Sequence, residues 1–148
     1  MLMHESLTLP AGPMAVGIDI ASVDSVAQSL ETFGDVYVNR LFREAEAAYA
    51  RSVPAQAAQR LAARFAAKEA AVKAFDLADA GVNMRDIEVV RLDSGACSLR
   101  LHGRVARLVR QKGFGHTAVC LSHDGGYAAA VVTALRLPEP DSPPMVDS

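Results

Sequence analysis

The sequence predicts a single α+β domain in which an antiparallel sheet packs against one long central helix. Alanine, arginine and lysine dominate residues 54–75, where apolar side chains recur at helical spacing. Strand-like segments lie on both sides of this helix, and two of their junctions carry turn sequences typical of hairpins. Helices and antiparallel strands in this order favour an α+β domain.

The first elements are a strand and two short helices. AVGIDI, residues 15–20, alternates as a half-buried strand does, with Gly17 and Asp19 on one face. Its other face carries three aliphatic residues, Val16, Ile18 and Ile20. Ser22 is a candidate N-cap for a helix that ends near Phe33, and a second short helix is expected over residues 43–50. Pro54 then begins the long helix.

The second half of the chain reads as two hairpins joined by a helix. Four strands are expected, over residues 86–92, 97–103, 116–122 and 127–135. Asp93-Ser94-Gly95 and Asp124-Gly125-Gly126 are the turn signals that close the two hairpins. A short basic helix over residues 104–112, stopped by Gly113, connects them.

The composition bounds the domain and its partners. Residues 1–13 read as a flexible leader and the proline-rich residues 138–148 as a flexible tail, which leaves 14–137 as the domain. With 15 basic and 17 acidic residues, a formal charge of −2 and no tryptophan, the chain has no electrostatic or stacking signature for nucleic acid. No apolar run reaches the roughly 18 residues of a membrane span.

The cysteines and the N-terminus indicate a reduced, cytoplasmic compartment. Cys97 and Cys120 have neither zinc-ligand spacing nor a disulfide-rich context, so we expect buried free thiols. The first residues lack a basic start followed by an apolar stretch, which a secretory signal needs.

One lysine of the long helix stands where a core residue is expected. Four apolar residues form one stripe at 3.6 residues per turn: Leu61, Phe65, Val72 and Phe75. Lys68 lies in the middle of this stripe, while Glu69 and Lys73 lie together on its flank. A buried ammonium needs an anionic partner, so Lys68 is either paired within the fold or placed where an anion binds.

Two carboxylates are candidate metal ligands. Asp19 ends an otherwise apolar strand and Glu69 lies on the helix flank, where the two carboxylates, water and phosphate oxygens would suit Mg²⁺. The alternative is a solvent-facing Asp19 and an i,i+4 pair between Glu69 and Lys73, worth about 0.2–0.5 kcal/mol. Arg64, Lys68 and Lys73 would offer positive charge to a phosphate beside this metal, or simply form a basic helix surface.

Other catalytic motifs are weak. Ser122-His123-Asp124 holds the residue types of a hydrolase triad, but adjacent strand residues point to opposite faces and cannot hydrogen-bond in series. His123, at a strand end, is left as a candidate ligand-binding residue or a structural histidine. The glycines form neither a dinucleotide fingerprint nor a P-loop.

Four segments in order resemble the holo-acyl-carrier-protein synthases, the small 4′-phosphopantetheinyl transferases. GIDI at 17–20 resembles the first motif of this family and FREAEAAYA at 42–50 its phenylalanine–glutamate–tyrosine segment. RFAAKEAAVKAF at 64–75 is similar to the central helix motif, a Lys-Glu pair followed four residues later by lysine. LSHDGGYAAAVV at 121–132 resembles the final serine–histidine strand pair.

The resemblance implies a Mg²⁺-dependent enzyme. It would transfer the phosphopantetheine arm of coenzyme A to a serine of an apo acyl carrier protein and release 3′,5′-ADP. Asp19 and Glu69 would hold the metal, and Glu69 and Lys73 would be catalytic. The proton acceptor for the serine stays open between a metal-bound water, Glu69 and another carboxylate. Phosphoryl transfer needs mainly alignment and charge stabilisation, which these residue types supply.

The resemblance also implies the coenzyme contacts and the assembly. Lys73 would meet the phosphates of coenzyme A, and His123 would lie near them. We assign Arg64 and Lys68 to the same coenzyme-binding group, with Lys68 supporting the charge of the site. Small members of the family are typically homotrimers with active sites at subunit interfaces. The alternative function is a non-catalytic module of the same fold that binds a carrier protein or coenzyme A.

The chain departs from the family pattern near the expected coenzyme site. DLADAG, residues 76–81, replaces a glycine-rich loop after the second lysine, and Gly95-Ala96-Cys97 replaces a Gly-Lys-Pro turn. The second change removes a cation, for which Arg91 or Arg100 could substitute.

A further departure concerns the carrier. The predicted helix at 22–33 contains Asp24 and Glu31 and no lysine or arginine, although the family uses arginines there; Arg40 and Arg43 lie just downstream. We hypothesise a carrier that is less acidic than usual, because electrostatic steering would be weaker. Equally fast modification of an ordinary acidic carrier would contradict this hypothesis.

Overall fold

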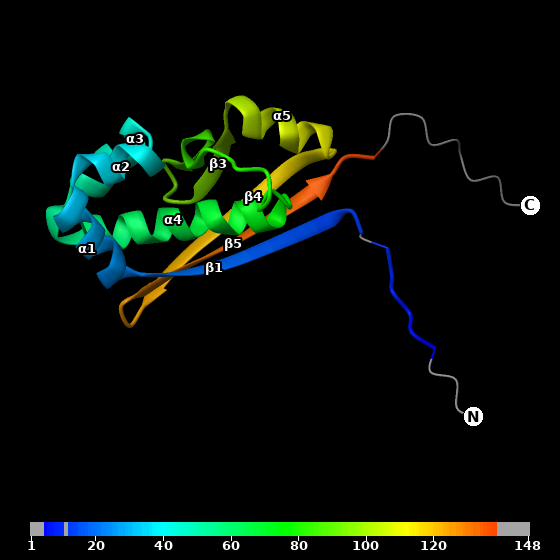
Figure 1. Ribbon diagram of the computed structural model, residues 1–148, viewed down its shortest axis with the longest axis horizontal. Helices are drawn as coiled ribbons and strands as arrows, with labels where there is room; N and C mark the ends of the chain where they lie inside the picture. The colour runs from blue at the N-terminus through cyan, green and yellow to red at the C-terminus, as the bar shows by residue number, and fades with distance from the viewer. Residues whose placement is uncertain (1–4, 11, 139–148) are drawn as a thin grey trace, which may run out of the picture.

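The computed structural model describes residues 5–10 and 12–138. A three-stranded antiparallel sheet in the order β1-β5-β4 is crossed by the long helix α4, and a two-stranded sheet β2-β3 lies beside it (Figure 1). The strands are β1 (Met14–Ser22), β2 (Ile87–Arg91), β3 (Cys97–Leu101), β4 (Phe114–Asp124) and β5 (Tyr127–Arg136). The helices are α1 (Val23–Phe33), α2 (Asp35–Leu41), α3 (Glu44–Arg51), α4 (Ala57–Ala74) and α5 (Gly103–Gln111). The predicted α+β class, with a long helix on an antiparallel sheet, is confirmed.

Most predicted elements form close to their expected bounds. The backbone N–H of Ser25 donates to Ser22 Oγ at 3.2 Å, so Ser22 is the N-cap of α1 as predicted. Pro54 opens a single 3₁₀ turn, Pro54–Gln56, before α4 begins. Helix α2 was not predicted, because its β-branched residues favour a strand; in the structure it is a helix that buries Val38 completely.

The face of the sheet that packs on α4 is built from small residues. A Cβ on Gly17 would lie 2.0 Å from the carbonyl oxygen of Ala70, so only glycine lets β1 approach α4 this closely. Four further alanines keep the contact tight, Ala66 and Ala70 on α4 and Ala128 and Ala130 on β5. This close packing places the side chain of Asp19, two residues after Gly17, against the flank of α4.

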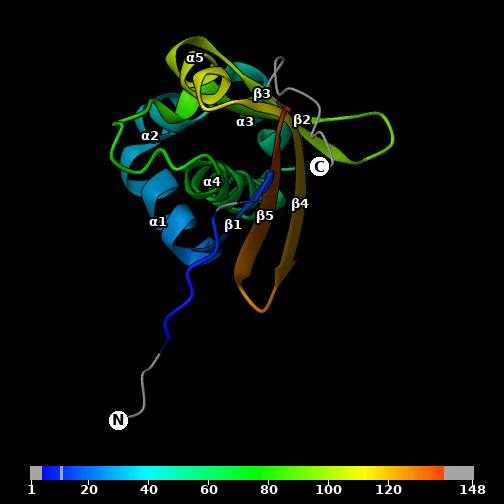
Figure 2. The ribbon, with the colours of Figure 1, turned by 90° about the vertical axis from the view of Figure 1, so that its right-hand side faces the viewer.

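The opposite face of the sheet has no cover among the described residues. Helices α1, α2 and α4 lie together on one side of β1, β5 and β4 (Figure 2). Seven apolar side chains of the other face expose 37–63% of their surface: Met14, Val16, Ile18, Ile20, Tyr127, Val131 and Leu135. The alternation predicted for β1 is therefore real, but its aliphatic face points away from the core and its glycine–aspartate face points toward the helix.

The remaining expectations have mixed outcomes. Residues 5–10 of the predicted leader are exposed and lie outside any helix or strand, while all but the first residue of the predicted tail lies outside the described residues. Both cysteines are free, but Cys97 is half-buried and Cys120 is exposed, so the expectation of buried thiols was wrong. Within residues 5–10 and 12–138, no helix is long and apolar enough to cross a membrane.

Candidate active site

The two predicted metal-ligating carboxylates converge on one flank of α4. Lys73 Nζ lies 3.0 Å from Asp19 Oδ1 and donates a second hydrogen bond to the carbonyl oxygen of Ile18 at 2.9 Å. Burial raises the pKa of Glu69, and the nearby negative charge of Asp19 raises it further, while Lys73 partly offsets both effects. Asp19, Glu69 and Lys73 thus form one cluster, which we call the carboxylate cluster.

The carboxylate cluster fits a hard divalent cation that takes the rest of its coordination shell from ligands outside the cluster. Among the described residues no group of three or more His, Cys, Asp and Glu side chains converges on one point. Mg²⁺ is commonly held by one or two carboxylates, with waters and substrate phosphates completing its shell. Burial and the neighbouring charge of Asp19 both raise the pKa of Glu69, and a cation between the two carboxylates would offset the second effect.

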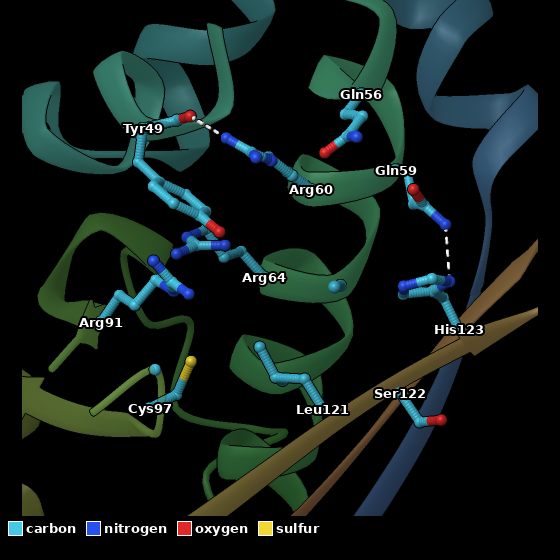
Figure 3. A pocket seen from close by; sticks show the side chains of 12 residues that line it. Tyr49, Gln56, Gln59, Arg60, Arg64, Arg91, Cys97, Leu121, Ser122 and His123 are labelled. Atoms are coloured by element: carbon cyan, nitrogen blue, oxygen red, sulfur yellow. Dashed lines mark hydrogen bonds between the residues drawn. The ribbon is translucent and has the colours of Figure 1, made fainter. Parts of the chain in front are cut away.

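A second set of residues forms a pocket of about 300 Å³, which we call the arginine pocket. It opens between the end of α3, the start of α4, the β2-β3 hairpin and strand β4 (Figure 3). The guanidinium carbons of Arg60, Arg64 and Arg91 lie 4.3, 4.2 and 5.4 Å from the centre of the Tyr49 ring. No aspartate or glutamate is among the described residues that line this pocket. Three cations held by one aromatic ring are ready for an anionic ligand.

Arg64 is the most constrained of these cations. Its surface is only 4% exposed, and its Nε has no hydrogen-bond partner within the described structure. Burial lowers the pKa of Arg64, because the charged guanidinium loses hydration. A buried N–H without a partner is costly, and an anion in the pocket would satisfy it.

His123 lies in the same pocket and is held in one orientation. Gln59 Nε2 lies 2.6 Å from His123 Nδ1, the contact drawn in Figure 3. An amide nitrogen can only donate, so Nδ1 accepts and the proton of the neutral ring sits on Nε2. This leaves the Nε2–H of His123 as a further donor for a ligand.

The predicted site residues therefore fall into two groups on different sides of α4. Arg64 and His123 line the arginine pocket, whereas Asp19, Glu69 and Lys73 form the carboxylate cluster. At 100° per residue, Glu69 and Lys73 lie roughly 140° and 180° around the helix from Arg64. One chain by itself does not bring these two groups into one cavity.

Lys68 belongs to neither group, which corrects the expectation that it helps bind a coenzyme. Its side chain is completely buried and its ammonium lies 2.9 Å from Glu46 Oε1. The same ammonium donates to the carbonyl oxygens of Met84 and Ile87, so all three N–H groups are used. Burial lowers the pKa of Lys68, and the charge of Glu46 opposes this shift. The misplaced lysine is paired inside the fold, and no ligand can reach it.

Sequence reasoning missed part of the arginine pocket. Tyr49 and Arg60 were not singled out, although Arg60 precedes Arg64 by one helical turn and so lies on the same face of α4. Of the two arginines proposed to replace the lost turn lysine, Arg91 lines the pocket. Arg100 instead approaches Glu88, at 3.8 Å. The pairing of β2 with β3 decides which of the two arginines lines the pocket. Helical spacing does not predict this pairing.

The arginines near the first helices also divide. Arg43 Nε donates to the carbonyl oxygen of Arg85 at 2.6 Å, and its guanidinium lies 3.9 Å from Asp86, so it is engaged within the fold. Arg40 is exposed in the last turn of α2. Of these two, Arg40 is the one positioned to meet a partner.

The chain is similar to known proteins of one superfamily. A model of the 4′-phosphopantetheinyl transferase superfamily matches residues 15–132. A holo-[acyl-carrier-protein] synthase of Gloeobacter violaceus is 40% identical over 120 residues, which are 81% of this chain and 91% of the relative. A holo-[acyl-carrier-protein] synthase of Salinispora arenicola is 42% identical over 123 residues, 83% of this chain and 98% of the relative. The ACPS-CoA complex of Chronobacterium ammoniagenes superposes with a TM-score of 0.71 at 32% identity, covering 84% of this chain and 98% of that one.

Proposed function

The chain belongs to the holo-acyl-carrier-protein synthases of the 4′-phosphopantetheinyl transferase superfamily, and we propose that it performs their transfer with Mg²⁺. The phosphopantetheine arm of coenzyme A passes to a serine of an apo acyl carrier protein, and 3′,5′-ADP leaves. The observation that carries this proposal is the convergence of Asp19, Glu69 and Lys73 on one flank of α4.

Each residue of the carboxylate cluster has a defined task in this proposal. Asp19 and Glu69 hold Mg²⁺, which when bound screens the pyrophosphate and stabilises the charge of the departing ADP. Lys73 uses two N–H groups on Asp19 and Ile18 and keeps the third for a phosphate oxygen of coenzyme A. The proton of the carrier serine passes to a metal-bound water, to Glu69 or to another carboxylate.

The arginine pocket supplies the other end of the coenzyme site. Arg60, Arg64 and Arg91 bind the phosphate-bearing nucleotide end of coenzyme A, and the unpartnered Nε of Arg64 gains an acceptor. His123 donates from Nε2 to the same end of the ligand. Arg91 thereby replaces the cation that the hairpin turn of this chain lacks.

A neighbouring copy of the chain brings the two halves of the site together. The carboxylate cluster and the arginine pocket lie on different sides of α4, and the open face of the sheet presents seven exposed apolar side chains. An apolar surface of this kind marks an interface. We place a second copy on it in a head-to-tail contact that closes into a homotrimer, so that one subunit offers its carboxylates to the arginine pocket of the next.

An intact-mass assay tests the transfer. Apo acyl carrier protein is incubated with the protein, coenzyme A and Mg²⁺; a phosphopantetheine mass gain is expected, with one 3′,5′-ADP released for each modified carrier. EDTA prevents the gain, and so does Asp19→Ala or Glu69→Ala, because each removes metal ligation and phosphate alignment together. Folding is retained in both variants, since neither side chain is part of the apolar core.

Two results would contradict this proposal. Near-normal turnover of both carboxylate variants would remove Asp19 and Glu69 from the active site. No mass gain with any carrier, despite bound coenzyme A, would support the non-catalytic binding module instead.

Native mass spectrometry tests the assembly separately. The wild-type chain is expected as a trimer, and Ile18→Asp on the open sheet face is expected as a monomer, because a carboxylate would be buried in the interface. Val36→Asp is the matched control: Val36 is also exposed, but it lies on α2, outside the open face. A monomeric wild type, or a trimer that survives Ile18→Asp, would refute this interface.

A further inference from the structure

Cys97 occupies a place in the arginine pocket that the transfer does not require. It is the first residue of β3, half-buried and not in a disulfide. Figure 3 shows its sulfur pointing into the pocket, below Arg64 and Arg91 and opposite Leu121. Any group attached to this sulfur would occupy the space between the arginines.

The same pocket carries an independent signal for an anionic ligand. Arg64 is 4% exposed and its Nε has no partner among the described residues, while Arg60 and Arg91 add two more cations around Tyr49. No carboxylate lines the pocket within the described part of the chain. Cavities lined by one sign of charge concentrate ligands of the opposite sign and raise their association rates by about 10–10³.

The other cysteine lacks this environment and serves as an internal reference. Cys120 lies on β4, opposite Val131 of β5, on the open sheet face that the proposed trimer covers, and it is exposed in the single chain. It is absent from the lining of the arginine pocket. The two thiols therefore differ in the charge that surrounds them.

We propose that Cys97 is a redox-sensitive modification site that captures small anionic disulfides in the arginine pocket and so blocks binding of the nucleotide end of coenzyme A. The capture depends only on the pocket. Its consequence for catalysis rests on the proposed transferase function.

The chemistry is thiol–disulfide exchange. The thiolate of Cys97 attacks one sulfur of a disulfide R–S–S–R, the Cys97–S–S–R bond forms, the R–S bond to the second sulfur breaks, and R–S⁻ leaves. The thiol proton passes to solvent. The incoming disulfide is the oxidant, and a second thiol reverses the reaction by the same route.

Three disulfides separate the sources of selectivity. The protein is incubated with coenzyme A disulfide, which carries phosphates, with glutathione disulfide, which carries carboxylates, and with neutral bis(2-hydroxyethyl) disulfide. Intact mass gives the rates, and peptide mapping places the adduct. Cys120→Ser isolates Cys97, Cys97→Ser isolates Cys120, and N-acetylcysteine gives each disulfide's intrinsic rate.

We expect one adduct at Cys97, with an anionic-to-neutral rate ratio about 10-fold or more above that of N-acetylcysteine. Added salt and Arg91→Gln both reduce this ratio, because each weakens the positive field. A preference for coenzyme A disulfide alone assigns the pocket to phosphates, and an equal preference for glutathione disulfide assigns it to anionic disulfides in general.

The proposal fails if the ratio at Cys97 equals that of N-acetylcysteine, or if the anionic disulfides modify Cys120 in preference. Binding of 3′,5′-ADP, measured by calorimetry before modification, after it and after addition of dithiothreitol, tests the blockage. Binding that survives a complete adduct would also overturn it. The capture rates need no carrier protein and no turnover, so their failure is distinguishable from failure of the proposed transfer.

Discussion

Two lysines of the same helix, Lys68 and Lys73, use their ammonium groups in opposite ways. Lys68 is completely buried and gives its three N–H groups to Glu46 and two backbone carbonyls. The side chain of Lys73 is 54% exposed and gives two N–H groups to Asp19 and Ile18. Both pair with a carboxylate and a carbonyl, yet only Lys73 has a donor and a surface left for a ligand.

This difference separates a charge that stabilises the fold from a charge that serves a substrate. Glu46 also accepts the backbone N–H groups of Arg43 and Val89, so the Lys68 pair ties α3, α4 and β2 together. Lys73 ties only β1 to α4, at the place where Asp19 and Glu69 meet. The buried pair has no spare capacity, whereas the exposed pair is incomplete until an anion arrives.

The largest expected effect is the loss of stability in Lys68→Met. The substitution keeps the apolar stem but leaves the Glu46 carboxylate buried without its cation, which costs about 3–5 kcal/mol. Chemical denaturation measures this change in the free energy of unfolding.

A double-mutant cycle is the control for this variant. Glu46→Gln removes the charge but keeps only one acceptor oxygen, for the N–H of Arg43 or for that of Val89. Lys68→Met combined with Glu46→Gln should still recover about 0.5–3 kcal/mol relative to the sum of the single changes, because no unpaired charge stays buried. A cost below about 1 kcal/mol for Lys68→Met alone would mean that the pair does not stabilise the fold.

The second largest expected effect is on the rate of the transfer reaction. Lys73→Met should change the free energy of unfolding by less than about 1 kcal/mol, because exposed ion pairs contribute little. The transfer rate should fall by about 10²–10³, since a positive donor facing the phosphates is lost. Lys112→Met is the matched control: Lys112 also donates to a carbonyl, that of Asp76, but it lies outside both halves of the site. Unchanged turnover in Lys73→Met would refute its assignment.

The smallest effect is a shift in the titration of Glu69. Its pKa is raised by burial and by Asp19 and lowered by Lys73, so Asp19→Asn should lower this pKa and Lys73→Met should raise it. A carboxyl group whose pKa is raised in the folded state contributes to stability at pH values below the pKa of an unfolded glutamate. This contribution is lost as the pH rises through the folded pKa. Raising the pH through the pKa of Glu69 should therefore destabilise the metal-free protein.

Carboxyl NMR titration without metal checks these shifts. At pH values above the pKa of Glu69, added Mg²⁺ should raise the melting temperature of the protein. At pH values below this pKa the effect should disappear, because the metal needs the ionised carboxylate. Shifts of the same sign in Asp19→Asn and Lys73→Met would contradict the arrangement of charges.

The pattern of the sequence was enough to predict the fold class, the cap at Ser22 and both hairpins, because these depend on local periodicity and turn chemistry. It was also enough to single out Asp19, Glu69 and Lys73, since motif order and helical spacing place them together. The same spacing identified Lys68 as anomalous. It left two explanations open, because an ammonium beside an apolar stripe looks the same whether its partner is Glu46 or a ligand.

Only the tertiary structure decided which anion Lys68 meets, which face of β1 is buried and which arginines share a pocket. Glu46 lies 22 residues from Lys68 along the chain, and Arg91 reaches Tyr49 from another element. The close approach of α4 to Gly17 turns the aliphatic face of β1 outward, against the ordinary expectation for a half-buried strand. Such outcomes depend on how distant segments pack, and local periodicity does not encode packing distance.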